Sequence, residues 1–67
     1  MSPEEMRHAM HEGRRVYGTC VTSRNPAFPA MLAKTGVDFV FIDTEHVALG
    51  RETLAWMCTS FLAHGIT

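Results

Sequence analysis

The densest cluster of groups that could do chemistry is Asp43-Thr44-Glu45-His46. Histidine works as an acid or a base near neutral pH, and a nearby carboxylate can orient its ring and fix its tautomer. The cluster directly follows the apolar run Phe39-Val40-Phe41-Ile42, which does not alternate with polar residues and is typical of a strand buried on both faces. Ligands of parallel α/β proteins bind at the carboxyl ends of the strands. The position therefore predicts an acid–base site with His46 as the base.

The same residues also fit a purely structural interpretation, which their spacing leaves open. Asp43 can cap a turn while Glu45 and His46 stand in solvent. A metal site made of these residues alone is disfavoured, because neighbouring side chains of an extended segment point to opposite sides and further ligands must come from elsewhere.

Two other groups of residues could bind metal or react. Glu4, His8 and His11 share one face of the first expected helix, where zinc could bind, although solvated side chains are commoner on a terminal helix. Cys20 and Cys58 form no CxxC pair, and a disulfide scaffold of this size usually carries more cysteines. Both are expected to be free thiols.

Five elements are expected to position the Asp43–His46 cluster: a helix over 3–12, a strand over 16–22, a helix over 26–34, a strand over 37–43 and a helix over 51–64. The first helix opens with the capping-box pattern of Ser2 and Glu5. The last carries one apolar face, made of Leu54, Met57, Cys58, Phe61 and Leu62. Ile66-Thr67 has the pattern of a further strand. Helices between strands imply parallel pairing and right-handed crossovers.

Composition and length exclude several classes of protein. The net charge of −1 argues against nucleic-acid binding, and no apolar run approaches the ~20 residues of a membrane span. The chain shows no secretory signal and no GxGxxG, GxxxxGK[ST] or GxSxG motif, so we expect a cytoplasmic protein without those nucleotide or hydrolase sites. Its 67 residues are fewer than half of a typical domain, and two parallel strands need neighbours.

The block from Gly36 to His46, GVDFVFIDTEH, resembles the signature G-(F/V)-D-(F/W)-(V/L)-x-I-D-x-E-H of the HpcH/HpaI aldolases, the metal-dependent class II pyruvate aldolases. Three further stretches are similar to that family: Tyr17-Gly18-Thr19, Asn25-Pro26 and the segment from Met31 to Gly36. The resemblance implies a (β/α)8 TIM barrel of about 250 residues. Residues 1–67 would be the N-terminal part of that single domain: its leading helix and first two βα units.

The resemblance also implies an activity, the reversible aldol cleavage of a 2-keto-4-hydroxy acid to pyruvate and an aldehyde. A divalent metal ion (Mg, Mn or Co) would act on the developing enolate, with ligands on later strands and none in this chain. His46 matches the general base, and Asp43 and Glu45 match acidic residues expected to orient it and the metal-bound water. The full-length parent would be a homo-oligomer acting on a small keto acid.

The chain departs from the family pattern after the histidine, where Val47-Ala48-Leu49 replaces a small residue followed by Pro. Since that loop borders the substrate pocket, the aldehyde partner is not identified. Two other interpretations stay open: a non-catalytic truncated remnant or binding module of the same fold, and a different barrel lyase that shares only the end of the second strand.

Overall fold

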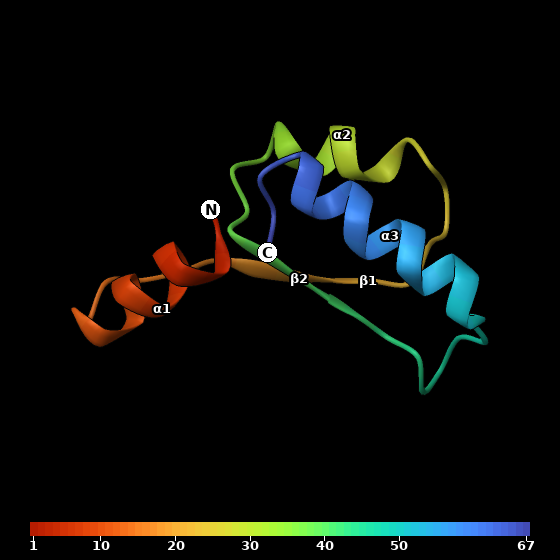
Figure 1. Cartoon of the computed structure of the whole chain (residues 1–67), viewed down its shortest axis with the longest axis horizontal. Coiled ribbons are helices and arrows are strands. Elements are labelled where there is room, and N and C mark those ends of the chain that lie inside the picture. The colour runs from red at the N-terminus through yellow and green to blue at the C-terminus, as the bar shows by residue number, and fades with distance from the viewer.

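The computed structural model describes residues 1–67 and contains three helices and two strands. In chain order they are α1 (Pro3–His11), β1 (Gly18–Val21), α2 (Phe28–Ala33), β2 (Phe39–Ile42) and α3 (Arg51–Ala63). Figure 1 shows α2 and α3 together on one face of the strand pair, while α1 lies beyond the end at which the strands begin. Each strand thus leads into a helix that returns over the same face.

The start of α1 is set by the capping box that the sequence predicts. The Glu5 backbone N–H donates to the Ser2 hydroxyl, and the Ser2 N–H donates to the Glu5 carboxylate, both over 3.1 Å. These two bonds satisfy backbone donors that no helical carbonyl can reach. The helix ends one residue earlier than expected, at His11, and Gly13 follows in the left-handed conformation at φ 76°.

The two strands pair in parallel, with Gly18 opposite Phe39 and Val21 opposite Ile42. A third segment lies against the free edge of β2. The Thr67 N–H donates to the Asp38 carbonyl over 3.0 Å, and the Val40 N–H donates to the Thr67 carbonyl over 2.9 Å. These are the two bonds of a parallel ladder. Thr67, in the segment expected to enter a further strand, therefore pairs with the free edge of β2, although the described residues end before a strand is formed there.

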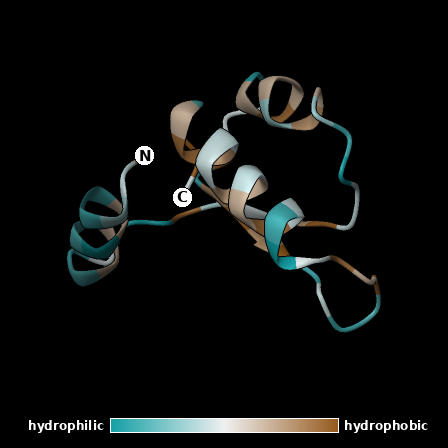
Figure 2. Ribbon diagram, turned by 45° about the vertical axis from the view of Figure 1, so that its right-hand side comes forward, coloured by the Kyte–Doolittle hydropathy of each residue, from teal (hydrophilic) through white to brown (hydrophobic).

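The core lies between the sheet and its two helices. Its four buried members are Val21, Met57, Phe61 and Ile66, and the partly buried residues packed against them are Leu32, Val37, Val40, Ile42 and Leu49. Figure 2 shows hydrophobic strand residues beneath the helices. One layer of helices therefore covers one face of the sheet.

The other face of the sheet is open, which corrects the expectation that β2 is buried on both sides. Phe41 is 64% exposed, and its neighbour in the ladder, Cys20, is also exposed. The reason is that the described residues supply helices for one face only. A similar correction applies to α3: Met57 and Phe61 are buried, but Cys58 and Leu62 are exposed on the side toward the free edge of the sheet.

The other four elements are also shorter than their expected ranges. The Asn25 carboxamide accepts from the Ala27 N–H over 2.9 Å, and this turn delays α2 to Phe28. The strands are limited to the four paired positions. None of the three helices has the length and apolar character needed to span a lipid bilayer.

Candidate functional site

Asp43 is fixed at the carboxyl end of β2. Its backbone N–H donates to the Val21 carbonyl over 3.1 Å, which extends the pairing with β1 one residue past the strand. Only 14% of its side chain is exposed. Side chains alternate along a strand, so Asp43 belongs to the same open face as Phe41. The end of the strand thus carries a partly buried carboxylate.

The Asp43 carboxylate builds the turn that follows it. Its Oδ1 accepts the backbone N–H of Glu45 over 2.9 Å and that of His46 over 3.0 Å. A short acidic side chain that accepts from backbone two and three residues ahead replaces the bonds that the strand no longer provides. The chain therefore reverses immediately after β2 and brings His46 back over Asp43.

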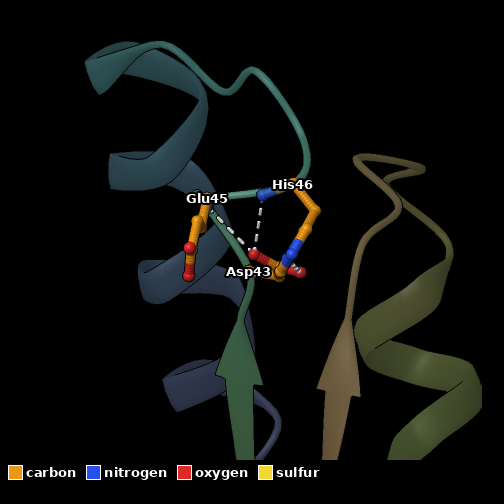
Figure 3. A network of polar contacts seen from close by, with 3 residues as sticks. All are labelled: Asp43, Glu45 and His46. Carbon is orange, nitrogen blue, oxygen red and sulfur yellow. Dashed lines mark hydrogen bonds and ion pairs between the residues drawn. The ribbon is translucent and has the colours of Figure 1, made fainter.

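The second oxygen of Asp43 contacts the imidazole. The distance between Asp43 Oδ2 and His46 Nδ1 is 2.9 Å, and 75% of the histidine side chain is exposed. Figure 3 shows the ring folded back onto the carboxylate. One aspartate therefore fixes both the backbone and the ring of the same histidine.

The pKa of Asp43 lies below its ordinary value. The largest cause is the hydrogen bond from the His46 backbone N–H, followed by the contact with the His46 ring; a smaller contribution comes from the Glu45 N–H, and partial burial opposes all three. The carboxylate is thus ionised near neutral pH and can only accept hydrogen bonds. The neutral imidazole must then carry its proton on Nδ1, which leaves the Nε2 lone pair free toward solvent.

Glu45 does not take part in this contact. Its backbone donates to Asp43, but its exposed side chain makes no hydrogen bond or ion pair, and Figure 3 shows the carboxylate pointing away from the ring. Of the two carboxylates expected to orient His46, the structure brings only Asp43 against it. The arrangement combines both interpretations of the sequence: Asp43 caps a turn, and the same side chain orients a histidine.

The residues of this chain do not by themselves fit a metal ion, because no three His, Cys, Asp or Glu side chains come together. On α1, His8 Nε2 lies 3.1 Å from one oxygen of Glu12, and Arg14 Nε lies 3.1 Å from the other. On the face formed by Glu4, His8 and His11, the carboxylate of Glu12 therefore contacts His8, but no three possible metal ligands come together. Both cysteines are free thiols, as predicted.

Leu49 lies in the same loop as His46 and packs against the core, a structural role that was not predicted for it. The signal for it was present in the sequence. Leu49 precedes Gly50, the N-cap of α3, and Leu54 stands at the fourth helical position. An apolar pair at these two positions is typical of a hydrophobic staple, which fixes the direction of a chain into a helix.

Comparisons with known proteins give one informative match. No family model matches the chain, and no curated protein matches it. Among solved structures, the chain is similar to a variant of the citrate synthase SbnG, with 39% sequence identity and a TM-score of 0.83. The match is to an enzyme. It covers 91% of this chain and 27% of the other, so this chain spans about a quarter of that enzyme.

These findings correct the assignment to the HpcH/HpaI pyruvate aldolases. The resemblance in the Gly36–His46 block predicts an aldolase of that family, whereas no family model matches and the similar structure bears the name of a citrate synthase. The sequence of the Gly36–His46 block is compatible with a strand end that occurs in enzymes other than the pyruvate aldolases. What the match supports is the mixed α/β arrangement, shared with part of a larger enzyme.

Proposed function

We propose that residues 1–67 supply the first two βα units of a (β/α)8-barrel enzyme that makes or breaks a carbon–carbon bond in a small keto acid. The parallel β1–β2 pair, the helices on one face and the third segment at Thr67 are compatible with a barrel wall. The open face with Phe41 would then point into the barrel. The similarity to part of a citrate synthase supports an enzyme of this kind.

The observation that carries the proposal is the Asp43–His46 contact at the carboxyl end of β2. This end is where barrel enzymes place their reacting groups. Asp43 holds Nδ1 over 2.9 Å and leaves Nε2 exposed. A histidine held in this way can take a proton at Nε2 and return it without changing its orientation.

In the cleavage direction, His46 Nε2 takes the proton of the hydroxyl group on C4 of a 2-keto-4-hydroxy acid. The C3–C4 bond then breaks, its electron pair goes to the pyruvate enolate, and an aldehyde leaves. Protonation of the enolate carbon completes pyruvate. In the reverse direction the enolate adds to the aldehyde carbonyl, and the imidazolium returns its proton to the new alkoxide. Asp43 stabilises the imidazolium in both directions.

A condensation that yields citrate is the second candidate, and the citrate synthase match favours it. The central carbon of citrate bears a hydroxyl group. It forms when an acetyl thioester loses a methyl proton and the resulting carbon nucleophile adds to a keto carbon; water then hydrolyses the thioester to citrate and a free thiol. His46 would deliver the proton to the oxygen of that keto group, as it does in the aldol addition. We also propose that a divalent cation (Mg, Mn or Co) takes part, held by residues outside this chain, where it would stabilise the negative charge of the enolate.

The test uses the full-length protein that carries these residues. Pyruvate release from 2-keto-4-hydroxy acids is measured beside citrate formation from a four-carbon keto diacid and an acetyl thioester. His46→Ala should lower kcat by about 10²–10⁴-fold, the usual contribution of a positioned acid or base. Metal affinity should stay near that of the unchanged protein.

The matched control is His11→Ala, an exposed histidine on α1 at the far end of the strands. It should leave kcat unchanged. A kcat within a few-fold of the unchanged protein for His46→Ala would overturn the assignment of His46. Absence of both reactions, with correct folding, would favour the non-catalytic remnant or binding module.

A further inference from the structure

We propose that Leu49 is a positioning residue, which anchors the loop that presents His46. The segment from Thr44 to Leu49 makes no backbone–backbone hydrogen bond, and the first such bond after Asp43 is from the Leu54 N–H to the Gly50 carbonyl. A loop without such bonds is free to move unless side chains hold it. The position of His46 therefore depends on what fixes the two ends of this segment.

The first end is held by Asp43, whose carboxylate accepts the N–H groups of Glu45 and His46. These bonds lie within three residues, so they shape the turn but do not attach the rest of the loop to the fold. The second end must be attached by another contact.

Leu49 makes that contact. It is partly buried and packs against the core cluster of Val21, Met57, Phe61 and Ile66. This cluster joins β1, α3 and the C-terminal segment, so Leu49 ties the loop to the core that these elements share. Val47, also half-buried, does not belong to this core packing. Leu49 is thus the anchor of the second end.

The anchor matters because the His46 side chain is 75% exposed and its ring makes one hydrogen bond, to Asp43. Water competes for that contact whenever the loop moves away. With Leu49 in the core, His46 stays within reach of Asp43 Oδ2 and keeps its proton on Nδ1. The consequence for catalysis rests on the proposed function, whereas the consequence for the ring contact does not.

The first test reads the ring directly in the full chain, labelled with ¹⁵N at histidine. The His46 signals are assigned by their loss in His46→Gln, and their shifts near neutral pH give the share of the Nδ1–H tautomer. Leu49→Ala should reduce that share toward the value of a free histidine. Leu49→Met, which conserves volume, should retain it.

Leu32→Ala is the matched control, because Leu32 is a partly buried leucine of α2 packed against the same core cluster. It should lower the thermal midpoint as Leu49→Ala does and leave the His46 signals unchanged. Val47→Ala, a change within the loop, should also leave them unchanged. If Leu49→Ala does not fold, Leu49→Val replaces it and should give a smaller shift in the same direction.

The second test is kinetic. Leu49→Ala should lower kcat about 10- to 100-fold, as expected for a small misplacement of a catalytic group, with KM changed less than about twofold. An unchanged share of the Nδ1–H tautomer in folded Leu49→Ala, or in folded Leu49→Val where the alanine variant does not fold, would overturn the inference whatever the activity. Alternatively, the Nδ1–H share falls in Leu49→Ala and not in Leu32→Ala while the unchanged protein catalyses neither pyruvate release nor citrate formation. That result would overturn the proposed function and support the role of Leu49.

Discussion

The ring of Phe39 occupies the space that a side chain at Gly18 would fill. The two residues are partners in the parallel ladder, and a Cβ built on Gly18 would overlap three carbon atoms of the ring. Glycine weakens a strand unless another group must approach its backbone closely. The close approach of Phe39 is therefore the physical reason for a glycine in the first position of β1.

Gly18→Ala should destabilise the protein by about 1–3 kcal/mol, because the ring must shift to make room. Urea unfolding of the full-length protein measures the change. Gly50→Ala is the control, since nothing lies within 4 Å of a Cβ there, and its free energy of unfolding should change by less than about 1 kcal/mol. Equal losses for the two variants would contradict the role of Phe39.

The hydrogen bonds of the α1 capping box affect the pKa of Glu5. The pKa of Glu5 lies below its ordinary value of 4.5, chiefly because of its bonds with the backbone and the hydroxyl of Ser2. Ser2→Ala should destabilise α1 by about 0.5–2 kcal/mol. It should also raise the Glu5 pKa toward 4.5, because the bond that holds its carboxylate depends on the cap. A titration of the Glu5 carboxyl carbon by NMR checks the second expectation, and a pKa that does not move would contradict it.

The sequence is sufficient to predict features determined by near neighbours. The order of the five elements and the capping box at Ser2 follow from local patterns, and the structure contains both. The further strand expected at Ile66-Thr67 is represented by the two bonds that pair Thr67 with β2. The Asp43–Glu45–His46 cluster could also be placed at the end of β2. Its neighbours in sequence are its neighbours in space.

Features that depend on what lies opposite could not be predicted in this way. The apolar run of β2 gave no sign that Phe41 would be 64% exposed, because burial depends on covering elements that the described residues supply on one face only. Nor could the spacing show which carboxylate contacts His46. Glu45 is closer in sequence, but the turn built by Asp43 directs the Glu45 side chain away.

Stability should depend on pH through Asp43. Its folded pKa lies below the ordinary value of 3.8, so the folded state holds the ionised form more strongly than the unfolded chain does. The stabilisation is therefore fully present above the unfolded pKa, and it is lost as the pH falls through the lower folded pKa. We expect the urea midpoint to decrease as the pH is lowered from about pH 6 to about pH 2, with the decrease confined to pH values below the unfolded pKa of Asp43. Asp43→Asn should flatten this portion of the curve, and an unchanged curve would exclude a contribution from Asp43.

Asp43→Asn should also separate the two tasks of this residue. The amide oxygen can still accept the N–H groups of Glu45 and His46, so the turn is retained. The amide nitrogen, in contrast, is a donor opposite Nδ1, and the imidazole must then accept there and carry its proton on Nε2. His46 would present the wrong tautomer for taking a proton at Nε2. We expect kcat to fall by about 10²–10⁴-fold, while the thermal midpoint at neutral pH falls only by the stabilisation that the ionised carboxylate supplied.

The matched control for this variant is Asp38→Asn. Asp38 also accepts a backbone N–H with its carboxylate, that of Tyr17 over 2.9 Å, but it lies at the opposite end of β2. Asp38→Asn should leave kcat and the His46 ring signals unchanged. If Asp43→Asn moves the proton of His46 to Nε2 and kcat nevertheless stays within a few-fold, the imidazole does not act as the base. A proton that stays on Nδ1 would show instead that the carboxylate does not set the tautomer.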